Sequence, residues 1–504
     1  MNIQEAKEQI KNTIVAYFSK DEEGEYIFPI EKQRPIFMMG PPGIGKTAIM
    51  EQIASEMGVG LLSYPMTHHT RQSVLGLSFV TTKEYDGISY NVTEYTMSEI
   101  MASIYDFIRD TNVKEGILFL DEINCVEESL QAVMLQFLQS KVLGKYRIPD
   151  GWVVVTAGNP PEYNESGRDF DIVTWDRLKR IDIIPDFTPW QNYAYNKSVN
   201  QAIISYIEQN VLDFYRVETL TSGKITFVSA RAWDDLSQML LLNEINGIPS
   251  DKNLISQYIQ NPRVASKFSE FYSRYNEYKQ KYPISQILIG QCSTSAFKNA
   301  KDSEGEERFA ICSILYSALD KIVSTTMHWL TTYKKLKDIH RLFNAFSQKE
   351  PSTMRTSLEV LLATSRTNYN LLKQSKSVSR EELSAVKSAI NLFNEECDYL
   401  FALELDNAHS LTHKLITSYL KNDLSDRRRE FNNERVVKTI SSINNVFMFI
   451  EKVFGEEEVF DLIDRLNMNP RIRTFIKEHD VVKYREYTKK LEQYAEQANF
   501  KKLS

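Results

Sequence analysis

The chain has 504 residues, of which 42% are hydrophobic, and its 60 Lys+Arg against 67 Asp+Glu give a formal net charge of −7. A chain of this length is expected to form about two to four domains with sizeable cores. The nearly balanced, slightly acidic charge does not favour nucleic-acid binding over the whole surface, although it is compatible with a local basic patch.

The ends and the cysteines indicate an intracellular protein. No long uninterrupted apolar run predicts a transmembrane helix, so no membrane contact is expected. The first residues are too charged for a signal peptide, and the spacing of Ile3, Ala6, Ile10 and Ile14 predicts an amphipathic helix instead. Scattered cysteines without a C-x-x-C pair predict free, buried thiols in a reducing cytoplasm: Cys125, Cys292, Cys312 and Cys397.

A glycine-rich segment fits the phosphate-binding pattern G-x-x-x-x-G-K-[ST] at every fixed position. Its residues are Gly40, Pro41, Pro42, Gly43, Ile44, Gly45, Lys46 and Thr47. The flanking apolar runs predict a buried strand before it and a helix after it, so that backbone N–H groups and a helix N-terminus surround a phosphate. We expect this segment to bind ATP, with Lys46 on the outer phosphates and the Thr47 hydroxyl as a Mg²⁺ ligand.

A second apolar run, at 117–120, ends in Asp121 and Glu122. A continuous apolar run predicts a buried parallel strand, and its carboxyl end lies at the nucleotide crevice of such a sheet. We expect Asp121 to bind Mg²⁺ directly or through water, and Glu122 to deprotonate the water that attacks the γ-phosphate. A simple turn after the strand is the alternative.

Two later strands carry further candidates. The run 152–156 predicts a strand followed by Asn159, whose amide could contact the γ-phosphate or the lytic water; a common Asn-Pro turn is the alternative. Another strand is expected near 181–184, preceded by Arg177 and Arg180. Either guanidinium could reach the nucleotide of a neighbouring subunit, with Arg177 as the first choice, and a surface salt bridge is the alternative for both.

The segment 227–233 predicts the start of a helix with Ser229 as its N-cap. Arg231 would then lie in the first turn of that helix. From a lid domain it could reach the nucleotide, whereas a solvent-facing arginine is the alternative.

Together these segments resemble the AAA+ ATPases, and within them the MoxR-like family. The resemblance covers about residues 30–250 and rests on five motifs: GPPGIGKT at 40–47, ILFLDEIN at 117–124, VVVTAGNPPEYN at 153–164, DRLKRI at 176–181 and FVSARAW at 227–233. It implies that Asn159 is the sensor-1 residue, Arg177 the arginine finger and Arg231 the sensor-2 arginine. It also implies a homo-hexamer, a protein client and, in many members, a partner with a von Willebrand factor A domain.

The same family places an insert within helix 2 and a second hairpin before the sensor-1 strand. Residues 77–82 and 85–92, joined by an Asp-Gly turn, predict the insert hairpin. Residues 141–149 fit a short version of the second. The second hairpin carries Lys141, Lys145 and Arg147. These basic residues keep a nucleic-acid-stimulated motor as an alternative interpretation.

The loop at 67–72 contains two adjacent histidines, His68 and His69. Neighbours in an extended chain point to opposite faces, and no acidic or cysteine cluster lies nearby, so metal binding is the weaker interpretation. A loop facing another subunit or the substrate is favoured, with Arg71 able to act in trans.

We therefore expect four parts: an N-terminal helical lead-in (1–30), an α/β P-loop AAA+ core with a parallel sheet flanked by helices (31–186), a helical lid (187–250) and a mainly α-helical C-terminal region of unknown role (251–504). In the last region Ser379 fits a capping box. The basic trio at 427–429 is flanked by acidic residues and predicts a solvated helix face. Apolar residues spaced by three and four predict helix faces in a bundle core: Leu383, Val386, Ile390, Phe393, Val436, Ile440, Ile443, Phe447, Ile450 and Phe454.

The leading hypothesis is a cytoplasmic, ATP-hydrolysing ring motor that remodels or matures a protein partner. A nucleic-acid-stimulated motor or translocase is the alternative, although nucleic acid is not the expected partner. A nucleotide-gated scaffold that hydrolyses slowly is a third interpretation, which the intact Asp121 and Glu122 disfavour.

Overall fold

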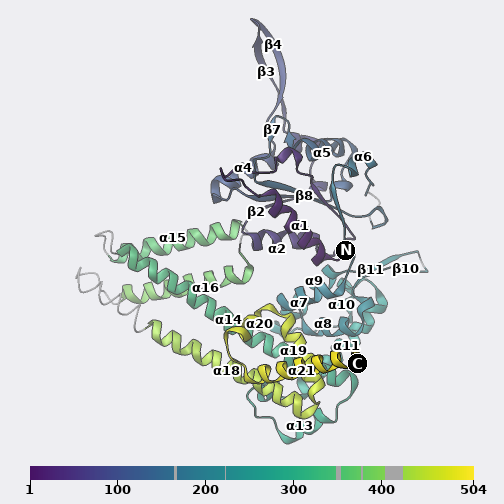
Figure 1. Cartoon of the computed structure of the whole chain (residues 1–504), viewed down its shortest axis with the longest axis vertical. Helices are drawn as coiled ribbons and strands as arrows, with labels where there is room; N and C mark the ends of the chain where they lie inside the picture. The colour runs from purple at the N-terminus through teal and green to yellow at the C-terminus, as the bar shows by residue number, and fades with distance from the viewer. Residues whose placement is uncertain (164–166, 222, 348–353, 376–377, 403–423, 504) are drawn as a thin grey trace. The chain divides into compact units, whose positions relative to one another are not determined.

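The computed structural model describes residues 1–163, 167–221, 223–347, 354–375, 378–402 and 424–503 (Figure 1). The chain divides into two compact units. The first comprises residues 1–189 with 367–383, and the second comprises 190–366 with 384–504. The first division falls three residues beyond the boundary expected at 186. Residues 190–250 belong to the same unit as the C-terminal region, and no division falls at 250.

A five-stranded parallel sheet forms the centre of the first unit. Its strand order is β2-β5-β8-β1-β9. The bounds of these strands are β1 Ile36–Met39, β2 Gly60–Pro65, β5 Gly116–Asp121, β8 Trp152–Gly158 and β9 Lys179–Asp182. β1 and β8 are buried along their whole length, as their continuous apolar runs predicted. The last strand begins two residues earlier than expected.

Six helices surround this sheet: α1 Ile3–Tyr17, α2 Lys46–Met57, α3 Arg71–Leu75, α4 Glu99–Thr111, α5 Glu128–Ser140 and α6 Ile172–Trp175. The predicted N-terminal amphipathic helix is α1, which packs on α2 with Ala6, Ile10 and Ile14 buried. Its Lys7 ammonium donates to the carboxylate of Glu56 on α2 at 2.6 Å. The lead-in is therefore part of the first unit rather than a separate arm.

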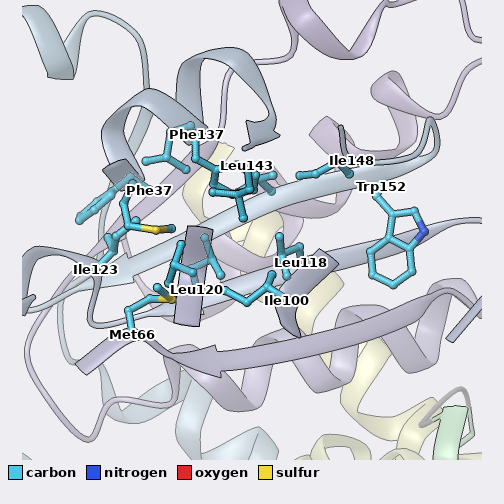
Figure 2. Close-up of a cluster of buried hydrophobic side chains, with 14 of the residues drawn as sticks. Phe37, Met66, Ile100, Leu118, Leu120, Ile123, Phe137, Leu143, Ile148 and Trp152 are labelled. Carbon is cyan, nitrogen blue, oxygen red and sulfur yellow. The ribbon is translucent and has the colours of Figure 1, made fainter. Parts of the chain in front are cut away.

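One hydrophobic core lies between the sheet and its helices (Figure 2). Leu118 and Leu120 of β5 contribute the centre, Trp152 of β8 closes one end, and Ile100 of α4 and Phe137 of α5 cover it. All five side chains are buried. This core fixes the strands whose carboxyl ends carry the predicted site.

Both predicted hairpins are present. β3 (Ser78–Tyr85) and β4 (Ile88–Tyr95) pair antiparallel through a turn in which Asp86 and Gly87 both have positive φ. In Figure 1 this long hairpin projects away from the sheet of its own unit. β6 (Val142–Leu143) and β7 (Tyr146–Arg147) form the short second hairpin.

The second unit is mainly helical. The helices that lie wholly or partly in it are α7 Phe187–Asn196, α8 Gln201–Gln209, α9 Ala230–Asn246, α10 Lys252–Tyr258, α11 Pro262–Lys281, α12 Ile284–Leu288, α13 Thr294–Lys301, α14 Gly305–Ser347, α15 Met354–Ser375, α16 Arg380–Ala402, α18 Leu424–Val453, α19 Glu456–Met468, α20 Pro470–Glu478 and α21 Val482–Leu503. The start of α7, the end of α15 and the start of α16 belong to the first unit. Ser379 caps α16 by accepting from the backbone N–H of Glu382, as predicted, and α18 ends at Val453, before Gly455. Of the basic trio, Arg429 is exposed, and the side chains of the other two lie outside the described residues.

The expected lid is not wholly helical. β10 (Arg216–Thr219) and β11 (Ile225–Val228) form an antiparallel hairpin between α8 and α9. The β-branched and aromatic run at 225–228, which follows Gly223 in a positive-φ turn, favours strand over helix.

A buried polar cluster joins the expected lid to the C-terminal helices within the second unit. The Asn469 amide donates to the Asp320 carboxylate of α14 at 2.8 Å and to the Tyr316 hydroxyl at 3.1 Å. Arg471 of α20 donates to the carbonyls of Tyr195 and Asn196, at the end of α7, and to the Ser198 hydroxyl. Ser198 in turn donates to Asp320 at 3.1 Å. Residues from three distant parts of the sequence thus share one set of hydrogen bonds.

In the described part of the chain, one helix has the length and composition of a membrane span: α14, over Gly305–Phe343. Of its most apolar window, 56% is buried inside the protein. The core helix of a soluble protein meets the same criteria, so this observation is weak, and the expectation of no membrane contact stays a prediction.

Candidate nucleotide site

The phosphate-binding segment connects β1 to α2, as its flanking runs predicted. Gly43 and Gly45 have φ of 75° and 96°, a left-handed conformation that side-chain-bearing residues rarely adopt. Gly45 is the N-cap of α2 and has no side chain to occupy the first turn. The helix N-terminus is therefore open toward the loop, which suits a bound phosphate.

Lys46 lies at the centre of the site. Its buried ammonium donates to the carbonyl oxygens of Gly40 at 2.7 Å and Pro41 at 3.0 Å, and to the side-chain oxygen of Asn159 at 2.8 Å. The structure therefore brings the predicted phosphate lysine together with the predicted sensor amide. Carbonyl oxygens satisfy the cation here, and anionic phosphate oxygens would be stronger acceptors for it.

The two predicted Mg²⁺ ligands, Thr47 and Asp121, are in contact. The Thr47 hydroxyl donates to the Asp121 carboxylate at 2.9 Å, and the other Asp121 oxygen accepts from the backbone N–H of Glu122 at 3.0 Å. A hydroxyl and a carboxylate in contact are the hard oxygen donors that Mg²⁺ prefers when it also binds a nucleotide. The residues present thus fit Mg-ATP.

Glu122 follows the end of β5 in a left-handed conformation, with φ of 56° and ψ of 34°. One of its carboxylate oxygens accepts from the Thr67 hydroxyl at 3.1 Å. Thr67 belongs to the short 3-10 turn η2 (Met66–His68) that follows β2. This loop was expected to face another subunit or the substrate, and its contact with Glu122 was not foreseen. The adjacency of β2 and β5 in the sheet is the signal that could have revealed it.

Asn124 is a second residue that sequence reasoning missed. It lies in the 3-10 turn η3 (Ile123–Cys125) and is buried, and its amide donates to the backbone carbonyl of Asn159 at 2.8 Å. The neighbouring Cys125 is half-buried, and burial together with the charge of Glu122 raises the pKa of its thiol. That thiol is therefore neutral at pH 7, rather than a reactive thiolate.

The two candidate finger arginines have different surroundings. Arg177, after α6, is exposed, and within the described residues its guanidinium has no hydrogen bond or ion pair. Arg180 is bound to Asp182 at 2.8 Å and stacks on the ring of Trp175 at 4.5 Å. Arg177 is thus available to a second molecule, whereas Arg180 already has partners. The role of Arg177 as the finger stays a prediction.

Arg231 is an exposed residue in the first turn of α9, and Ser229 caps that helix by accepting from the backbone of Ala232, as predicted. This helix belongs to the second unit. The sensor-2 role of Arg231 therefore stays a prediction.

The paired histidines do not form a metal site. His69 contacts Ser73 at 3.3 Å and packs edge-on against Tyr64, while His68 is exposed. Among the described residues, no group of three or more His, Cys, Asp or Glu side chains could hold a metal ion. Arg71 begins α3 and is exposed.

The three basic residues of the β6–β7 hairpin all have internal partners. Lys141 is buried and donates to the carbonyl of Leu138, and burial lowers its pKa to about 8. Lys145 pairs with Glu94 of β4 at 2.5 Å, and Arg147 pairs with Glu31. These side chains hold the hairpin to the first unit and do not form a free basic patch.

A sequence model of the family described as "ATPase family associated with various cellular activities (AAA)" matches residues 36–166. This segment is an AAA ATPase domain. It contains the phosphate-binding segment, both carboxylates of β5 and Asn159, so the protein is an ATP hydrolase. No curated protein matches the chain.

Two solved structures are among those similar to this chain. The "Structure of C. elegans PCH-2" is 11% identical over 54% of this chain and 69% of its own, with a TM-score of 0.26. A mutant of RuvB from Thermotoga maritima is 13% identical over 76% of this chain and 87% of its own, with a TM-score of 0.24. Similarities this weak add nothing to the family match.

Proposed function

We propose that this ATPase is MoxR-like, assembles as a cytoplasmic homo-hexamer, and couples ATP hydrolysis to the remodelling or maturation of a protein client. A von Willebrand factor A-domain protein is a candidate partner, by resemblance alone. ATP hydrolysis itself follows from the AAA domain. The client and the ring are the parts that need support.

The β3–β4 hairpin is the observation that carries the proposal of a protein client. Its register places Phe79, Tyr85, Ile88 and Tyr90 on one face, and each is exposed by 43% or more. The same face also carries the ion pair of Lys83 with Glu94. The opposite face carries Val80 and Tyr95 among mainly polar side chains, which include Ser78, Thr82, Glu84, Ser89, Asn91 and Thr93. Exposed aromatic and aliphatic side chains gathered on a projecting element indicate contact with protein.

The ion pairs of the two hairpins in the first unit support a protein client over nucleic acid. Nucleic-acid binding requires cations that can neutralise phosphates. The basic residues that kept this alternative open, Lys141, Lys145 and Arg147, are already bound to Leu138, Glu94 and Glu31. On the β3–β4 hairpin, Lys83 also pairs with Glu94.

Arg177 supports the ring. Among the described residues Arg177 is exposed, makes no side-chain hydrogen bond or ion pair, and interacts electrostatically with Asp171. Such an arginine suits a phosphate supplied by a neighbouring molecule, because its guanidinium stays charged and grips oxygens bidentately. Assembly would then complete each nucleotide site.

The site residues account for the steps of hydrolysis. Lys46 leaves the carbonyls of Gly40 and Pro41 to bind phosphate oxygens, and Thr47 and Asp121 provide the ligands for Mg²⁺, which neutralises developing phosphate charge when bound. Glu122 accepts a proton from the attacking water once its carboxylate is free of Thr67. Asn159 and Arg177 stabilise charge on the transferred group.

The test is a capture experiment with a Glu122→Gln protein, which is expected to bind ATP, hydrolyse it poorly and retain its client. We would isolate it from its native cells with and without ATP, and with and without nuclease. A specific protein retained only with ATP, insensitive to nuclease, supports the proposal. Nuclease-sensitive recovery of nucleic acid contradicts it and favours the translocase.

A matched pair of hairpin variants sharpens this test. On the Glu122→Gln background, Tyr90→Ser should lose the captured protein, because it removes an aromatic ring from the apolar face. Asn91→Ser, its neighbour on the polar face, should retain it. Equal capture by both variants would exclude this face as the client surface.

A further inference from the structure

A buried amide connects the predicted γ-phosphate sensor to the chain segment that leads toward the predicted finger. Asn124 is 1% exposed and lies two residues after Glu122. Its side chain is too deep to touch a nucleotide in the way that Lys46 or Thr47 can. Any effect it has on hydrolysis must pass through other residues.

The hydrogen bonds of Asn124 reach two segments. Its amide nitrogen donates to the carbonyl of Asn159 at 2.8 Å and to that of Arg168 at 3.3 Å. Its own backbone carbonyl accepts from the backbone N–H of Arg168 at 3.0 Å. Asn124 therefore binds both the end of β8 and the segment that runs to α6 and Arg177.

The packing around this amide is close. A Cβ atom placed on Gly158 would lie 2.4 Å from the side-chain oxygen of Asn124, well inside contact distance. Only glycine at position 158 allows the amide to lie against β8. The hydrogen bonds and the close packing together indicate that the Asn124 side chain is held in one position. A buried polar group is costly unless its partners are in place.

The bond to Asn159 has a geometric consequence. The carbonyl of Asn159 lies beyond the β1–β8 ladder, whose last pair is Met39 with Gly158, so no strand holds it. Asn124 supplies the missing donor. On the same residue, the side-chain oxygen of Asn159 accepts from Lys46. Fixing the backbone of Asn159 thus fixes the direction of its amide at the phosphate site.

We propose that Asn124 is a positioning residue for ATP hydrolysis, which holds Asn159 in its sensing geometry. This inference rests on the proposed role of Asn159. It does not depend on whether the client is a protein or a nucleic acid.

The test compares Asn124→Asp, alone and combined with Asn159→Ala, in the full-length protein. The introduced carboxylate keeps the shape of the amide but loses its donor. We expect kcat to fall about tenfold, with the Kd for ATP within about twofold of the wild-type value. On the Asn159→Ala background the same substitution should change kcat less than about twofold, because no sensor amide is left to position.

The pH profile provides a second readout. Burial should raise the pKa of the introduced carboxyl, and its protonated form can again donate a hydrogen bond. The ratio of variant to wild-type kcat should therefore rise as pH falls from about 8 to about 6. A purely structural defect would not recover in this way. Asn124→Ser, which keeps a short donor, is the second variant if Asn124→Asp does not fold.

Asn112→Asp is the matched control. Asn112 is exposed at the end of α4, just before β5 begins. It therefore lies at the edge of the sheet opposite the site, and its substitution should leave kcat unchanged. A tenfold loss of kcat that is equal on the wild-type and Asn159→Ala backgrounds would overturn the proposal. Full kcat in Asn124→Asp would also overturn it. If Asn159→Ala alone keeps full kcat, the role of Asn159 itself is wrong, which is a separate failure.

Discussion

The Thr67 hydroxyl donates a hydrogen bond of 3.1 Å to the carboxylate of Glu122, and so joins the ends of two adjacent parallel strands. Glu122 is the predicted base for the attacking water. A carboxylate oxygen that accepts from a hydroxyl is less available to accept a proton, and the bond also fixes the direction of the side chain. In this structure Thr67 therefore restrains the base.

Replacing Thr67 with valine should raise basal ATP hydrolysis. Valine keeps the branched shape and removes the donor, so the Glu122 carboxylate loses its restraint. We expect the client-free kcat to rise about two- to fivefold, since a hydrogen bond to a charged group in a half-exposed setting contributes about 1 kcal/mol. Steady-state hydrolysis checks this, and a lower kcat in Thr67→Val would show that the hydroxyl orients the base instead.

Arg177 and Glu122 should act from different subunits. Arg177→Ala alone should lower kcat by about 10³-fold or more, because it removes the charge that stabilises the transition state. Glu122→Gln alone should also be nearly inactive. In an equal mixture of the two proteins, about a quarter of the interfaces combine an intact Glu122 with an intact Arg177, and activity should reappear in proportion.

A control variant distinguishes Arg177 from Arg180 as the trans-acting residue. Arg180→Ala removes an exposed pair with Asp182, and it should leave kcat within about twofold of wild type. If the mixture of Arg177→Ala and Glu122→Gln stays inactive although the proteins co-assemble, Arg177 does not act in trans.

Because Lys141 is buried, the free energy of unfolding should increase with pH in the alkaline range. Its pKa in the folded protein is lowered to about 8, whereas in the unfolded chain it stays near the usual value of about 10.4. Between these values the unfolded state binds more protons, so the free energy of unfolding rises with pH from about 8 to about 10.4, by roughly 2–3 kcal/mol for this residue. Below pH 8 the burial cost is fully present.

Lys141→Met is the variant that isolates this effect. Chemical denaturation at pH 7 should show a more stable first unit, and the difference from wild type should disappear as pH approaches about 10. Comparing the two proteins cancels the titration of the many tyrosines. A difference that does not vary with pH would mean that Lys141 stays charged in the folded state.

The polar cluster of the second unit should be sensitive to the loss of Asn469. Asn469→Leu removes both the donor to Asp320 and the side-chain oxygen that caps α20, so the second unit should lose about 2–4 kcal/mol of stability. Asp320→Asn should be much milder, because burial already raises the pKa of this carboxyl and disfavours its charge. Equal losses for both variants, measured by denaturation, would contradict this account.

Much of the first unit could be predicted from the sequence, because its strands are short apolar runs and its loops have fixed chemistry. The runs at 35–39, 117–120 and 152–156 became β1, β5 and β8 with little shift. The phosphate segment, the metal pair Thr47 and Asp121, and both hairpins follow from local patterns of this kind.

Most of the missed features depend on contacts between distant segments, and the strands of the expected lid are a local exception. The bond from Thr67 to Glu122 and that from Asn124 to Asn159 span 55 and 35 residues, and no local pattern encodes them. The sequence left the β6–β7 hairpin as a candidate for nucleic-acid binding, whereas the structure pairs Lys145 with Glu94 and Arg147 with Glu31. In the expected lid, the helical interpretation overlooked the strand propensity of 225–228.

The hydrogen bonds that Asn469 and Arg471 make with Asp320 and the end of α7 have a mechanical consequence. They clamp α14 near Asp320, and the helix continues for another 27 residues to Ser347. At about 1.5 Å per residue this is a rod of about 40 Å, so a tilt of about 5° at the clamp moves its tip by roughly 3–4 Å. Because α18 packs along α14 and Thr326 is hydrogen-bonded to Thr439, the two helices would move together. They would convert a small rotation of residues 190–250 into a displacement large enough to break or make contacts at a distance.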